Sequence, residues 1–181
     1  MSLRVLIAGI GNIFLSDDGF GVEVAQRLLA EPFPDGVRVV DFGIRGLHLA
    51  YELGDGYDAA ILIDAAPRGG QPGTIYVIEP DLSAMQPDTG AESPLLDAHG
   101  MEPVAVLSLL KTLGGKIDRV LIIGCEPETS EDGIGLSEPV SRAVDEAVGV
   151  VRNLVAQLES EGAAAFGGRA EPAGLAVRRE T

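Results

Sequence analysis

The sequence contains a single cysteine and only two histidines in 181 residues. One cysteine excludes an intramolecular disulfide framework, and it excludes a zinc or iron–sulfur site built from several thiolates. Two histidines exclude a metal site made mainly of imidazoles. Any metal site in this chain must therefore be rich in carboxylates.

Basic residues are also scarce. Thirteen Lys and Arg stand against 28 Asp and Glu, which leaves a formal net charge of −15 at pH 7. Binding of nucleic acid and attachment to an anionic membrane surface both require clustered basic side chains. The sequence argues against both, and its charge favours a soluble monomer.

Long apolar segments are missing too. No run approaches the roughly 18 residues of a membrane span, and the apolar run at residues 5–10 is too short for the core of a signal peptide. We therefore expect a soluble cytoplasmic protein. The hydrophobic content of 46% is ordinary for a folded domain.

Apolar runs with strand character alternate with apolar residues at helical spacing. Strands are predicted at 3–9, 37–42, 59–64, 73–78 and 118–124, and helices at about 20–31, 47–53, 101–113 and 137–159. Nearly continuous apolar strands are typical of a buried parallel sheet. We predict an α/β fold in which a twisted, mostly parallel sheet of about five strands is sandwiched between helices on both faces.

The same patterns predict one domain. It spans residues 1–161, and the Gly, Ala, Pro and Arg composition from Gly162 onward predicts a flexible C-terminal tail over residues 162–181.

Ligands in such folds bind outside the carboxyl ends of the strands. Asp17 and Asp18 follow the first predicted strand, Asp64 ends the third, and His99 precedes a predicted helix. Converging carboxylates repel one another unless a cation or a shared proton relieves them. With His99 added, the oxygen and nitrogen donors suit a divalent transition ion that keeps open positions.

Each of these residues also has a purely structural interpretation. Asp17 or Asp18 could cap the helix that follows, because an acidic side chain suits a helix N-terminus. Asp64 could accept backbone N–H groups of the next turn, and His99 could cap the helix predicted near residue 101.

Other chemistry is poorly supported. Gly9 and Gly11 begin like a dinucleotide fingerprint, but Phe14 occupies the place of the third glycine and two aspartates follow. Cys125 has no histidine at a recognisable partner position, so we interpret it as a packing residue. His48 is interpreted as a residue on a helix surface.

The loop sequences resemble those of one family. The segment Gly9-Ile-Gly-Asn-Ile-Phe-Leu-Ser-Asp-Asp-Gly-Phe-Gly21 closely resembles the opening motif of the hydrogenase maturation endopeptidases. The resemblance continues in order at 41–43, 63–65, His99, 124–128 and 135–137, so it covers about residues 3 to 160.

This resemblance implies an endopeptidase that removes the C-terminal extension of a nickel–iron hydrogenase large-subunit precursor after nickel insertion. By position, Asp18, Asp64 and His99 would meet the nickel and act in catalysis. The ion would come with the substrate, and no tightly bound cofactor is expected in the free protein. It could polarise a peptide carbonyl and activate a water, while Asp17 or one of the ligands takes the proton.

Two further loops are implicated by the same resemblance. Asp41 and Gly43 match a loop associated with substrate selection. Gly11, Asn12 and Asp17 belong to the loop that supports the site.

Two other classes stay open at the level of sequence. A non-cleaving maturation chaperone that senses nickel-loaded precursor needs the same ligands as a protease. A receiver-like phosphotransfer domain also has an acidic pair and an aspartate after strands one and three. However, a receiver domain needs a hydroxyl residue after strand four and a lysine after strand five. This chain has Val-Ile-Glu-Pro at 77–80 and Cys-Glu-Pro at 125–127 instead.

Overall fold

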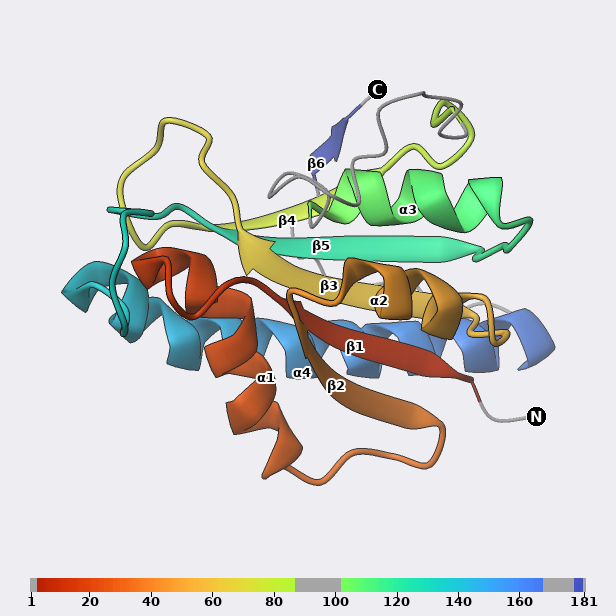
Figure 1. Ribbon diagram of the computed structural model, residues 1–181. Coiled ribbons are helices and arrows are strands. Elements are labelled where there is room, and N and C mark those ends of the chain that lie inside the picture. Colours follow the sequence, from red (N-terminus) through yellow and green to blue (C-terminus); the bar gives the residue numbers. More distant parts are fainter. Residues whose placement is uncertain (1–2, 87–101, 168–177, 181) are drawn as a thin grey trace.

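A mixed sheet forms the centre of the computed structural model, which describes residues 3–86, 102–167 and 178–180 (Figure 1). Its strands are β1 (Val5–Ile10), β2 (Val37–Gly43), β3 (Ala59–Ala65), β4 (Ile75–Pro80), β5 (Arg119–Cys125) and β6 (Arg178–Glu180). They lie in the order β2-β1-β3-β5-β4-β6. The predicted α/β fold with a mostly parallel sheet of five strands is confirmed, and the three-residue β6 adds a sixth.

Helices cover both faces of this sheet. They are the short 3-10 helix η1 (Ser16–Gly19), α1 (Phe20–Leu29), α2 (Gly46–Leu53), α3 (Pro103–Thr112) and α4 (Glu138–Gly167). None of the helices within the described ranges is long and apolar enough to cross a bilayer.

Two apolar cores follow from the alternation of side chains along the strands. Val5 and Ile7 of β1 face α1 and α4, where the first core forms. Leu6 and Ala8 face α2 and α3, where the second core forms. Both faces of β1, β3 and β5 are therefore buried, which explains why these strands are apolar almost throughout.

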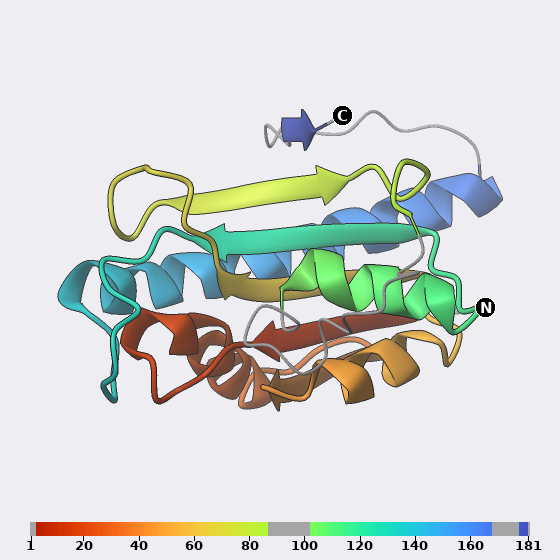
Figure 2. The same ribbon diagram turned by 45° about the horizontal axis from the view of Figure 1, so that its top comes forward.

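Strand direction determines where the functional loops meet. β1, β2, β3 and β5 are parallel, whereas β4 runs antiparallel to β5 (Figure 2). The segments that follow β1, β2, β3 and β5 therefore emerge at one edge of the sheet. We refer to this as the carboxyl edge, and it is the edge at which the sequence predicts a site.

The C-terminal region departs from the predicted boundaries. Helix α4 continues to Gly167 instead of ending near residue 159, and β6 pairs with the end of β4. Alanines at 163–165 favour this continuation, because alanine has the highest helix propensity. The single domain over 1–161 and a flexible tail beyond it stay predictions.

Close contact between α1 and the sheet depends on Gly21. A Cβ atom at this position would lie 2.1 Å from the carbonyl oxygen of Ile63 and 2.2 Å from that of Ile10. Only glycine permits this approach. It seats the start of α1, and with it η1, directly on the carboxyl ends of β1 and β3.

We therefore expect Gly21→Ala to lower the free energy of unfolding by about 2–3 kcal/mol through overpacking, or about 4–12 °C in Tm. Gly149→Ala is the matched control, because a Cβ there meets no atom within 4 Å on the exposed side of α4. It should raise stability by about 0.5–1 kcal/mol. Thermal unfolding followed by circular dichroism checks both, and equal stability of the two variants would contradict the packing described.

Candidate active site

The loop between β1 and η1 positions Asp18. The backbone N–H of Asn12 donates to Asp18 Oδ2 at 2.8 Å. Gly11 has a φ of +143°, and a Cβ there would lie 1.9 Å from the carbonyl oxygen of Asp18, so glycine is required. The N–H of Gly11 also donates to the carbonyl of Gly43 at 3.1 Å, which ties this loop to the end of β2.

The capping interpretation of the acidic pair is wrong. Leu15 and Gly19 occupy the N-cap positions of η1 and α1, and neither helix has a side-chain cap. Asp17 and Asp18 lie inside η1 and have separate surroundings.

Asp64 is buried at the end of β3, with 8% of its surface exposed. Burial raises the pKa of its carboxyl well above the usual range, and the negative charge of Asp18 adds to this. The hydrogen bond from the N–H of Ala65 to Asp64 Oδ1, at 2.8 Å, opposes that shift, while the charge of Glu102 supports it. Asp64 thus accepts a backbone N–H as one interpretation expected, but it also faces Asp18 across a poorly hydrated edge.

Asp17 has a different environment. Its carboxylate is fully buried and accepts hydrogen bonds from the N–H groups of Glu128, Thr129 and Ser137, and from the Ser137 hydroxyl. The four distances run from 2.7 to 3.1 Å. These bonds occupy both oxygens, so Asp17 anchors loops instead of receiving a proton. Ser137 lies 120 positions away in the chain, and no local sequence signal identifies it as the partner of Asp17.

The third predicted ligand, His99, lies outside the described residues. In the described part of the chain, no group of three His, Cys, Asp or Glu side chains could hold a metal ion. Glu102, which directly precedes α3, is near enough to Asp64 to raise its pKa. The residue that precedes α3 therefore lies near Asp64.

The predicted substrate-selection and supporting loops lie side by side. Asp41, Gly43, Gly11 and Asn12 line one depression of about 290 Å³ at the ends of β1 and β2. Asp41 is held there by Gln26, whose Nε2 donates to Asp41 Oδ2 at 2.8 Å. The structure thus brings these two loops together next to Asp18.

Cys125 is confirmed as a packing residue of the first core, and His48 as a residue on a helix surface. Burial raises the pKa of the Cys125 thiol to about 12, and the negative charges of Asp17 and Glu126 contribute. The thiol is therefore neutral near pH 7 and is not a nucleophile. His48 is exposed on α2.

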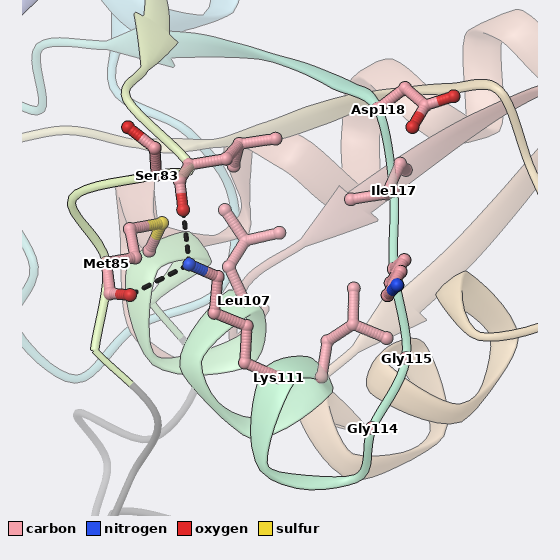
Figure 3. A pocket seen from close by; sticks show the side chains of 11 residues that line it. Ser83, Met85, Leu107, Lys111, Gly114, Gly115, Ile117 and Asp118 are labelled. Atoms are coloured by element: carbon pink, nitrogen blue, oxygen red, sulfur yellow. Dashed lines mark hydrogen bonds between the residues drawn. The ribbon is translucent and has the colours of Figure 1, made fainter.

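A larger cavity of about 440 Å³ lies at the opposite edge of the sheet (Figure 3). Its walls include Leu107 of α3, and the ammonium group of Lys111 donates to the carbonyls of Leu82 and Met85 (Figure 3). These bonds hold the segment after β4 against α3. The cavity contains none of the predicted site residues, and its lysine already has a structural role.

Comparison with known proteins identifies the family. A model of the hydrogenase maturation proteases matches residues 22–154. The hydrogenase expression/formation protein HoxM of Azotobacter vinelandii is 36% identical over 180 residues, which cover 97% of this chain and 84% of HoxM. The hydrogenase expression/formation protein HupD of Rhizobium leguminosarum bv. viciae is 34% identical over 192 residues, which cover 95% of this chain and 93% of HupD.

The chain belongs to the hydrogenase maturation protease family.

Solved structures of this family share the fold. The hydrogenase maturating endopeptidase HybD from E. coli matches with a TM-score of 0.67 at 27% identity, covering 86% of this chain and 93% of HybD. The [NiFe] hydrogenase maturation protease HycI from Thermococcus kodakarensis KOD1 matches with a TM-score of 0.59 at 25% identity, covering 84% and 92%. The resemblance inferred from the loop motifs is confirmed, and so is the enzyme class of maturation endopeptidase.

The loop anchor of this family member should be essential for stability. Asp17→Ala leaves three partly buried backbone N–H groups and the Ser137 hydroxyl without their acceptor, so we expect it to lower the free energy of unfolding by about 3 kcal/mol, or about 6–12 °C in Tm. Asp132→Ala, which removes an exposed acid from the same loop, should change Tm by less than about 2 °C. Thermal unfolding distinguishes them, and a stable Asp17→Ala protein would contradict the anchoring role.

Asp64 should instead cost stability in the metal-free protein. The pKa of Asp64 is raised in the folded state, so the folded protein is stabilised when this carboxyl is protonated at low pH. That stability is lost as pH rises through the folded-state pKa. Asp64→Asn keeps the acceptor for Ala65 but removes the charge. At pH 7.5 we expect it to raise Tm by about 2–4 °C, the effect of about 1 kcal/mol in a chain of this size.

The difference should shrink as pH falls and the wild-type carboxyl becomes protonated in the folded state, because its pKa is raised by burial. Measurement of Tm against pH for both proteins, without metal, tests this. A variant less stable than wild type at pH 7.5 would show that the Asp64 charge is not under strain.

Proposed function

We propose that this protein is an endopeptidase that removes the C-terminal extension of a nickel–iron hydrogenase large-subunit precursor after nickel insertion. The observation that carries the proposal is the burial of Asp64 beside Asp18 at the carboxyl edge. Two carboxylates in this position repel each other, and a divalent cation relieves that repulsion. Membership of the maturation protease family supports the same conclusion.

In this proposal the nickel belongs to the substrate. Asp18, Asp64 and His99 meet the ion when the precursor binds, and no metal is tightly bound in the free protein. A mixed set of oxygen and nitrogen donors suits a divalent transition ion. The partner in this proposal is the large-subunit precursor, which brings the nickel with it. We place the reaction in the cytoplasm.

The chain's own residues divide the work. Asn12 orients Asp18 through its backbone N–H, and Ala65 orients Asp64 in the same way. An ion held by Asp18, Asp64 and His99 would supply a Lewis acid for the peptide carbonyl and for a water. Because both oxygens of Asp17 already accept hydrogen bonds, one of the ligand carboxylates would take the proton.

A maturation chaperone that binds the nickel-loaded precursor without cutting it would use the same side chains. The two functions differ only in product. The depression lined by Asp41 and Gly43 lies beside Asp18 and would serve substrate selection in either case.

A processing assay tests the proposal. Nickel-loaded precursor is mixed with the wild-type protein, and the released C-terminal peptide is followed by mass spectrometry. We expect cleavage that requires nickel and falls at least about 100-fold in Asp18→Asn, Asp64→Asn and His99→Ala, because each change removes a ligand of the ion that activates water.

Matched controls are available in the same chain. His48→Ala removes the other histidine, and Asp35→Asn removes an exposed acid at the far edge of the sheet; both should cleave at the wild-type rate. Binding of precursor without peptide release would favour the chaperone function. Cleavage that persists in all three ligand variants would exclude the proposed site.

A further inference from the structure

Apolar side chains are exposed on two loops at the carboxyl edge. Ile134, in the loop after β5, is 82% exposed, and Phe14, in the loop after β1, is 62% exposed. A single exposed apolar side chain is ordinary, but apolar side chains on adjoining loops can mark a site of contact with another protein. We refer to Phe14 and Ile134 together as the apolar tip.

Hydrogen bonds join the two loops that carry the apolar tip. The N–H of Gly133 donates to the carbonyl of Phe14 at 2.9 Å, and the N–H of Ser16 donates to the carbonyl of Gly133 at 2.9 Å. The hydroxyl of Ser16 also donates to the carbonyl of Glu131 at 2.9 Å. Both loops lie at the same end of the molecule in Figures 1 and 2. The two loops are thus joined next to Phe14 and Ile134. The buried Asp17 adds hydrogen bonds from the N–H groups of Glu128 and Thr129 in the loop after β5.

The apolar tip is also connected to the carboxylate pair. The side-chain oxygen of Asn12 accepts a hydrogen bond from the N–H of Phe14 at 3.0 Å. The backbone N–H of the same asparagine donates to Asp18. Asn12 therefore links Phe14 to the predicted ligand Asp18, and a polypeptide that covers Phe14 would lie close to Asp18.

Charge specifies the kind of partner. Residues 126–137 contain no Lys or Arg, and Glu128, Glu131 and Asp132 are exposed on the same loop as Ile134. An apolar centre with an acidic border is complementary to an apolar patch with a basic border, and such complementarity speeds association at low salt.

We propose that Phe14 and Ile134 are the docking surface for the polypeptide substrate, and that they receive an apolar, basic-bordered patch of the large-subunit precursor. This inference rests on the proposed function for the identity of the partner. The apolar tip contributes to binding of the precursor and takes no part in bond cleavage.

Steady-state processing and direct binding test the proposal. In Phe14→Ala and Ile134→Ala we expect KM for the nickel-loaded precursor to rise about 5- to 30-fold, the effect of truncating an interface anchor, with kcat within twofold of wild type. Leu29→Ala is the matched control, because Leu29 is 53% exposed at the far end of α1. It should leave both constants unchanged, and all three variants should keep the wild-type Tm.

Ionic strength tests the acidic border separately. The wild-type kcat/KM should fall as salt is raised from 50 to 300 mM, and the double variant Glu131→Gln, Asp132→Asn should show a clearly smaller fall. Asp35→Asn should keep the wild-type salt dependence.

The outcomes separate this inference from the proposed function. Wild-type cleavage with unchanged KM in both tip variants would overturn the docking surface alone. Precursor that binds without being cut, with Kd raised in the tip variants, would support the docking surface and overturn the endopeptidase. A protein that neither binds nor cuts the precursor would overturn both. Wild-type dimers that Ile134→Ala converts to monomers, with precursor binding unaffected, would show that a second copy of this chain covers the tip.

Discussion

The arrangement of the carboxyl edge depends on one buried carboxylate. Asp17 has no exposed surface, yet it accepts hydrogen bonds from two loop amides and from both the amide and the hydroxyl of Ser137, just before α4. A charge in such a place is tolerable only when its lone pairs are satisfied. Asp17 therefore holds the loop after β5 against the loop after β1. Asp18 is the next residue, so the orientation of the proposed ligand follows from the anchoring of its neighbour.

Asp17 and Asp64 thus have opposite energetic roles. The carboxylate of Asp17 accepts four hydrogen bonds, whereas Asp64 is desolvated near the charge of Asp18 and receives one backbone hydrogen bond. The first arrangement stabilises the fold, and the second leaves the repulsion between two carboxylates uncompensated by a hydrogen-bond network. Such tension between stability and activity is typical of catalytic sites. In this protein the two roles belong to different elements, with Asp17 in the 3-10 helix η1 and Asp64 near the end of β3.

Much of this architecture could be predicted from the sequence, because apolar periodicity is a local property. The apolar runs predict β1 to β5, and the position of Asp18 and Asp64 after the first and third strands predicts that both lie at the carboxyl edge. The antiparallel direction of β4 and the pairing of β6 could not be predicted, since strand direction depends on distant partners. The role of Asp17 was missed for the same reason, because its partners lie more than a hundred positions away. The loop motifs supplied what periodicity could not, namely the family.

The position of Cys125 has a consequence for metal selectivity. This residue is the only sulfur nucleophile of the chain, and its thiol is buried and neutral between β5 and the surrounding core. The surface therefore offers no thiolate, the ligand that copper(I) and zinc prefer. A folded chain that exposes no thiolate is also protected from inactivation by oxidation of a surface thiol.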